Sequence, residues 1–78
     1  MKEINKRIAE VRATLGLSME KFGSRIGITR NSINAIEKGV NNPSSQTIKL
    51  ICKEFNVDYF WLTEGADVDM FMKLPNTL

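Results

Sequence analysis

Side chains that can contact DNA bases are concentrated between residues 30 and 35. Arginine can donate two hydrogen bonds to guanine O6 and N7, and asparagine can pair with adenine N6 and N7. Serine can donate or accept a hydrogen bond, and the alanine methyl group fits against the thymine methyl group. The candidates for base contacts are Arg30, Asn31, Ser32, Asn34 and Ala35. The alternative interpretation is a solvated polar helix face with no ligand.

Two short helices held across a tight turn are needed to present these side chains. Ser18 and Thr29 stand where helix N-caps belong, and Gly23 and Gly27 stand at the expected helix crossing and turn. A helix that lies in a major groove crosses its predecessor at roughly 90–120° through a turn of about three or four residues. This crossing needs a small side chain at the closest approach and a residue that tolerates positive φ in the turn. The sequence therefore predicts a helix-turn-helix, with a recognition helix over residues 30–38.

Three further helices are predicted around this pair. Apolar residues at helical spacing predict a first helix over about 4–15. Ser44 or Ser45 can cap a fourth helix that runs to about Phe55, and Asp58 can cap a short fifth helix before Gly65. We therefore expect an all-α, compact five-helix domain over residues 1–65.

The remaining residues, 66–78, have a different pattern. Val68, Met70, Met72 and Leu74 alternate with Asp69, Phe71 and Lys73, a period of two that is typical of a strand. A lone strand is not stable, so this extended C-terminal tail needs a partner strand or a groove. The tail is predicted to be a dimerisation arm or a link to a further domain, and the alternative is a disordered linker stub.

The charge is unevenly distributed along the chain. The net charge is +2, but residues 1–57 hold ten Lys and Arg against five acids, whereas residues 58–78 hold Lys73 against four acids. A basic head suits binding to a polyanion such as DNA.

Several classes of protein are improbable from composition. The chain has no histidine and one cysteine, Cys52, which falls at helical spacing with apolar neighbours and is interpreted as a small core residue. We expect no metal and no cofactor, and the sequence shows no nucleophile–base pair or phosphate-cradling loop that would indicate an enzyme. No apolar run approaches the roughly 18 residues that cross a membrane, so we expect a cytoplasmic protein.

A set of short motifs, in order, gives the chain a family resemblance. From about Ile4 to Gly65 it resembles the Cro/repressor (XRE-type) helix-turn-helix domains, which implies a lambda-repressor-like fold. The matching elements are Arg12, LS at Leu17-Ser18, IT at Ile28-Thr29, IEKG at Ile36 to Gly39, NPSSQT at Asn42 to Thr47, and VDYFWLTEG at Val57 to Gly65.

The resemblance implies roles for further residues. Arg12 and Glu37 would form a partly buried ion pair that ties the first helix to the end of the third. Met19 stands where family members commonly carry a glutamine that reaches a phosphate, so only its backbone N–H remains for that contact. The other phosphate-contact candidates are Thr29, Lys38, Asn41, Asn42 and Ser44.

The resemblance also implies how the protein would act. Such domains bind double-stranded DNA as homodimers on palindromic operators, with half-sites about one DNA turn apart. The simplest expected function is a phage-type transcriptional repressor. The candidates for the dimer surface are Leu50, Tyr59, Phe60, Met70 and Met72, although an aromatic such as Phe60 is more often a core residue. The alternative is a protein-interaction module, such as an antitoxin-like partner of another protein.

Overall fold

The computed structural model describes residues 3–73 of the 78-residue chain. Its elements are α1 (Glu3–Leu15), α2 (Met19–Ile26), α3 (Arg30–Glu37), α4 (Ser45–Phe55) and α5 (Tyr59–Glu64), and no regular strand occurs in this described part. The predicted all-α, five-helix fold is confirmed. The recognition helix ends one residue earlier than predicted, because Lys38 is its C-cap.

Four polar residues start the helices that follow α1. The side-chain oxygens of Ser18, Thr29, Ser44 and Asp58 each accept a hydrogen bond from the backbone N–H three residues later. Each contact satisfies one of the N–H groups that a helix start leaves unpaired. The predicted caps are therefore confirmed, and Ser44 rather than Ser45 caps α4.

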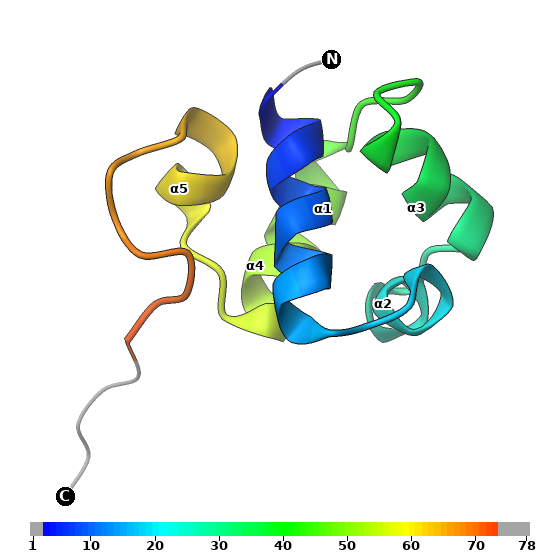
Figure 1. The fold of residues 1–78 in the computed structure, drawn as a ribbon, viewed down its shortest axis with the longest axis horizontal. Coiled ribbons are helices and arrows are strands. Elements are labelled where there is room, and N and C mark those ends of the chain that lie inside the picture. The colour runs from blue at the N-terminus through cyan, green and yellow to red at the C-terminus, as the bar shows by residue number, and fades with distance from the viewer. Residues whose placement is uncertain (1–2, 74–78) are drawn as a thin grey trace, which may run out of the picture.

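The core joins all five helices around α1. Figure 1 shows α1 between α3 and α5, with α4 behind it. Ile8 and Val11 of α1 are fully buried, as are Ile33 of α3 and Leu62 of α5. A second set of contacts holds α2 on α4, where the rings of Phe22 and Phe55 stack with centroids 4.7 Å apart. The remaining buried apolar residues are Ile26, Ile36, Ile51 and Val57.

The chain after α5 folds back on the segment between α4 and α5 (Figure 1). An isolated antiparallel bridge pairs Phe71 with Val57. The N–H of Asp58 donates to the Met70 carbonyl at 2.8 Å, and the N–H of Met72 donates to the Asn56 carbonyl at 2.9 Å. The tail therefore finds its partner within the same chain.

The predicted strand is wrong, because residues 66–73 form only the isolated bridge at Phe71. Met70 and Phe71 both pack against the core, whereas Val68 and Met72 are exposed. The physical reason is that the chain bends at residues 67, 68 and 70, so alternate side chains do not stay on one face. Leu74, which the alternation also includes, lies outside the described residues.

Candidate nucleic-acid interface

The two glycines of the helix-turn-helix have separate roles. A Cβ atom on Gly23 would lie 2.2 Å from the Ile28 carbonyl oxygen, and the Ile28 N–H donates to the Gly23 carbonyl at 2.8 Å. Gly27 ends α2 with φ of 75°, in the left-handed region that favours glycine. Gly23 thus allows the close approach of the turn to α2, and Gly27 allows the chain to reverse into α3.

Helix α3 buries one side and exposes the other. Ile33 and Ile36 are buried, whereas Arg30, Asn31 and Ser32 are exposed. Within residues 3–73 the side chains of Arg30 and Asn31 make no hydrogen bond or ion pair. Both are therefore available to an external ligand.

The other two base-contact candidates are less accessible than predicted. Asn34 and Ala35 were expected on the solvent face of α3, but both are half-buried. The loop after α3 folds over this end of the helix, because the N–H groups of Val40 and Asn41 both donate to the Ala35 carbonyl. The start of α3 therefore carries its most exposed polar side chains.

Thr29 and Ser32 form a hydroxyl pair at that start. The Thr29 Oγ1 accepts from the Ser32 N–H at 3.2 Å and donates to the Ser32 Oγ at 3.1 Å. This arrangement leaves the Ser32 hydroxyl hydrogen unused, so it can donate to a base or a phosphate.

A shallow groove of about 440 Å³ runs between α3 and the start of α4. It brings the base-contact candidate Ser32 together with three phosphate-contact candidates, Asn41, Asn42 and Ser44. Its other lining residues are Ile28, Ile36, Pro43 and Thr47. The groove thus joins the recognition helix to the loop that the sequence predicts to flank it.

Lys38 and Met19 lie outside this groove. Lys38 is exposed at the end of α3, and its N–H donates to the Asn34 carbonyl at 3.0 Å. Met19 is half-buried and packs against the core. Its side chain therefore makes an apolar contact at the position where family members commonly carry a glutamine. Its backbone N–H is in the first turn of α2, where helix geometry leaves N–H groups without partners in the helix.

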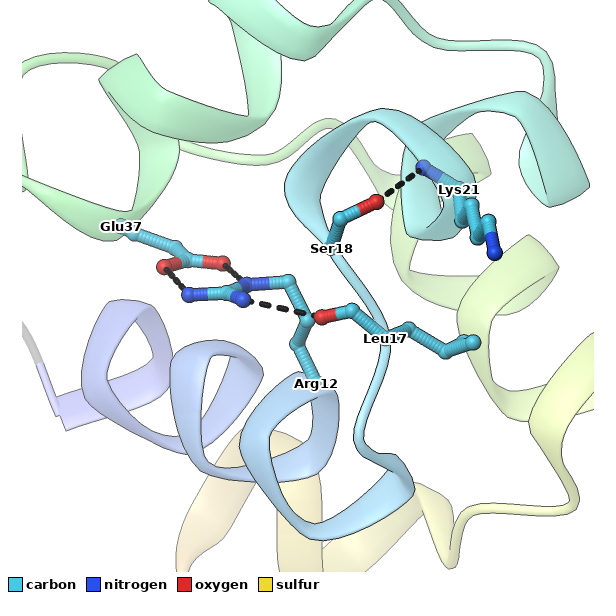
Figure 2. A network of polar contacts seen from close by, with 5 residues as sticks. All are labelled: Arg12, Leu17, Ser18, Lys21 and Glu37. Atoms are coloured by element: carbon cyan, nitrogen blue, oxygen red, sulfur yellow. Dashed lines mark hydrogen bonds and ion pairs between the residues drawn. The ribbon is translucent and has the colours of Figure 1, made fainter.

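Arg12 links α1 to the end of α3 and to the segment that leads into α2 (Figure 2). Its Nε and Nη2 donate to the two carboxylate oxygens of Glu37 at 2.6 and 3.0 Å, and its Nη1 donates to the Leu17 carbonyl at 3.0 Å. The hydrogen bonds to Glu37 raise the pKa of Arg12 above its ordinary value, against the opposing effect of burial. The ion pair implied by the family resemblance is thus present, and it also fixes the entry to α2.

A buried asparagine that sequence reasoning missed supports the same region. Asn5 of α1 is fully buried, and its Nδ2 donates to the Ile36 carbonyl at 2.7 Å and to the Asn41 carbonyl at 3.1 Å. Its Oδ1 has no hydrogen-bond partner. The available signal was a polar residue three positions before Ile8, inside the apolar stripe of the first helix.

Arg7, which the sequence also did not single out, hydrogen-bonds to carbonyls of α5. Its Nε donates to the Leu62 carbonyl at 2.7 Å and its Nη2 to the Thr63 carbonyl at 3.4 Å. A cation that hydrogen-bonds the last carbonyls of a helix stabilises that end. Arg7 therefore fixes α5 against α1.

The dimer-surface candidates are exposed with one exception. Phe60 is 58% exposed, so it is not a core residue, and its ring meets that of Tyr59 edge to face at 5.5 Å. Leu50, Tyr59 and Met72 are also exposed, whereas Met70 is half-buried against the core. The four exposed side chains are therefore surplus to the core of a single copy.

Two other kinds of feature, a metal-binding cluster and a membrane-spanning helix, do not occur in the described part of the chain. No cluster of three or more His, Cys, Asp or Glu side chains able to hold a metal ion occurs there. None of the helices among these residues has the length and apolar character needed to span a membrane.

Comparisons with known proteins agree on the family. A family model described as Helix-turn-helix matches residues 8–62. The chain is 42% identical over 64 residues to YgzD, an uncharacterized HTH-type transcriptional regulator of Bacillus subtilis, covering 78% of this chain and 97% of that protein. It is also 39% identical over 56 residues to antitoxin PezA of Streptococcus pneumoniae, covering 72% of this chain but 35% of PezA.

A solved structure shows the same fold. The P22 c2 repressor, in a crystal structure with synthetic operator 9T, superposes with a TM-score of 0.73 at 19% identity, covering 81% of this chain and 96% of that one. Because the matched family model spans most of the chain and includes α2 and α3, this protein belongs to the XRE-type helix-turn-helix family of DNA-binding transcriptional regulators.

Proposed function

We propose that this protein is a transcriptional repressor of the phage type that binds a palindromic operator as a homodimer. The observation that carries the proposal is the start of α3, where Arg30, Asn31 and Ser32 are exposed and Arg30 and Asn31 have no partner among residues 3–73. The likeness to the operator-bound P22 c2 repressor supports this orientation of the motif.

In this proposal the residues of α3 read bases in the major groove. Arg30 donates to guanine and Asn31 pairs with adenine, while Ser32 offers its free hydroxyl hydrogen. Asn34 and Ala35 contribute through the part of their surface that stays exposed. Base contacts supply specificity, so the operator sequence depends chiefly on the first two residues of α3.

Phosphate contacts flank this helix and set its register on the duplex. We assign them to the hydroxyls and amides around the groove, to the Lys38 ammonium and to the Met19 backbone N–H. The residues concerned are Asn41, Asn42 and Ser44, which line the groove, and Thr29 at the N-cap of α3.

The proposed division of the chain follows from these roles. Residues 1–65 form the DNA-binding domain, and residues 66–78 form a tail that serves dimerisation or a link to a further domain. The exposed apolar side chains of Tyr59, Phe60 and Met72 support a dimer surface on this side of the molecule.

A selection from randomised duplex DNA at moderate salt tests the proposal. The retained pool is sequenced, and we expect an inverted repeat with half-site centres about 10 base pairs apart. Enrichment of single half-sites would support DNA reading without the dimer. A folded protein that enriches no sequence would contradict the proposal.

One observation favours a second candidate function. The chain matches antitoxin PezA, and α5 exposes apolar side chains that suit a protein partner. A protein-interaction module would bind DNA weakly, and its binding to the partner would depend little on salt. DNA binding through phosphates weakens steeply with salt, so the salt dependence of each interaction separates the two functions.

A further inference from the structure

The segment around Phe71 pairs with residues 56–58 along one side of its backbone. Along the other side it makes no backbone hydrogen bond within residues 3–73. The Met70 carbonyl and the Met72 N–H point inward, to Asp58 and Asn56. In an antiparallel pair, the residue between two such inward groups points its own N–H and carbonyl to the other side. The backbone groups of Phe71 therefore face outward, and neither has a hydrogen-bond partner within residues 3–73.

An exposed edge of this kind is a template for pairing with another chain. The five residues centred on Phe71 read Asp-Met-Phe-Met-Lys. If two copies align antiparallel about Phe71, and the bend at residue 70 straightens on pairing, Asp69 of each copy lies opposite Lys73 of the other. Opposite charges directly across an antiparallel pair stabilise it, and two such pairs form because the arrangement is symmetric.

The side chains at this edge are accessible. Asp69 and Lys73 are exposed, and neither makes an ion pair within the described part of the chain. Met72 is also exposed, and the same alignment places it opposite Met70 of the second copy. The charges and the apolar groups of the segment are therefore self-complementary.

We propose that two copies of this chain pair through residues 69–73 as antiparallel strands, with Phe71 on the two-fold axis. The occupant of the edge is a second copy because the charge pattern complements itself. Figure 1 shows residues 66–73 and α5 on the side of α1 away from α3, so pairing there leaves the recognition helix uncovered. This inference names the interface of the dimer in the proposed function, and it rests on that dimeric form.

Charge-swap variants test the alignment. Asp69→Lys and Lys73→Asp each place like charges opposite each other twice in a homodimer, and we expect roughly tenfold weaker dimerisation in sedimentation experiments at low salt. An equimolar mixture of the two variants, and the double variant Asp69→Lys/Lys73→Asp, both restore opposite charges and are expected to recover the dimer. Asp67→Lys is the control, because it makes the same change of charge as Asp69→Lys but outside the paired segment.

Amide hydrogen exchange tests the backbone contact directly. The Phe71 N–H has no partner among residues 3–73 of its own copy and is bonded in the proposed dimer, so its exchange is expected to slow as protein concentration rises. The Met72 N–H already donates to Asn56 within the chain and is the internal reference.

The outcomes separate this interface from the DNA-binding proposal. Dimerisation that is equal in all charge variants, Phe71 exchange that is independent of concentration, or a monomer at millimolar concentration would each overturn the interface. Loss of dimer in the single variants with recovery in the mixture supports it, whether or not any DNA sequence is enriched. A monomer that still enriches half-sites overturns the interface and leaves base reading intact.

Discussion

Asn5 of α1 and Ile36 of α3 are joined by a 2.7 Å hydrogen bond in the fully buried core, from the Asn5 Nδ2 to the Ile36 carbonyl. The second hydrogen of the same Nδ2 goes to the Asn41 carbonyl, in the loop that lines the groove. One buried amide thus holds the end of the recognition helix and the loop after it at a fixed separation.

Asn5→Ala is expected to lower the free energy of unfolding by about 1–3 kcal/mol. The variant removes the donor of the buried hydrogen bond to the Ile36 carbonyl and of the part-buried one to the Asn41 carbonyl, and losing the partner of a buried polar group costs about that much. Urea unfolding measures the change, with Glu10→Ala on the exposed face of the same helix as the control. Equal stability of the two variants would show that the amide contributes no net stabilisation.

The Arg12–Glu37 pair is expected to matter more for stability than for DNA affinity. Glu37→Ala strands a guanidinium that is only 22% exposed, so we expect a loss of about 2–3 kcal/mol in the free energy of unfolding. The control is Glu54→Ala, which breaks the exposed Arg25–Glu54 pair and should cost less than about 1 kcal/mol. A Glu37→Ala variant that melts like wild type yet binds DNA poorly would contradict this assignment.

Helix starts and the turn could be predicted from the sequence because local chemistry determines them. Ser18 and Thr29 cap helices through their own side chains, and Gly27 reverses the chain because it lacks a Cβ atom. Such features depend on a few neighbouring residues, so they are visible without the tertiary fold.

Long-range polar contacts could not be predicted in the same way. Asn5 reaches carbonyls 31 and 36 residues away, and Arg7 reaches carbonyls of α5 more than 50 residues away. Any backbone carbonyl can accept such a bond, so no residue type marks the acceptor. The Arg12–Glu37 pair was predicted from the family resemblance, and not from the spacing of the two residues.

The tail shows the limit of a periodic pattern. Alternation from Val68 to Leu74 predicted a strand, but residues 66–73 form only an isolated bridge, and the chain bends at residues 67, 68 and 70 while Met70 and Phe71 both pack on the core. A period of two identifies a strand only when the backbone stays extended, and the pattern itself does not show whether it does.

Gly23→Ala is expected to destabilise the helix-turn-helix. The added methyl group would lie 2.2 Å from the Ile28 carbonyl oxygen, a backbone atom that cannot move without shifting the turn. We expect a loss of about 1–3 kcal/mol or more, as for overpacking of a tight core. Thermal unfolding measures the loss, and Ser24→Ala at the next, exposed position serves as the reference. Similar melting temperatures for the two variants would show that the turn adapts to a side chain.

Cys52 is expected to make folding less favourable at alkaline pH. Burial, and then the nearby negative charge of Asp58, raise the pKa of its thiol above the ordinary value of 9.0. The unfolded chain therefore loses this proton first, so the contribution is fully present below pH 9.0 and is lost as the pH rises through the folded pKa. The difference in unfolding free energy between wild type and Cys52→Ala should fall from pH 8 to pH 10, a window set by that ordinary value. A constant difference would mean that the thiol ionises alike in both states.

Arg30→Ala and Lys38→Ala are expected to weaken DNA binding in different ways. Arg30 lies at the exposed start of α3, so its loss should cost about 1–3 kcal/mol on the selected operator and relax preference at one base pair. Lys38 lies at the exposed end of α3, where we propose a phosphate contact, so its loss should weaken all sequences alike and reduce the salt slope by about 1. Binding isotherms on the operator, on single-base variants and across salt concentrations distinguish the two effects. If Arg30→Ala lowers affinity uniformly and reduces the salt slope, then Arg30 contacts phosphate, and base reading at the start of α3 falls to Asn31 and Ser32.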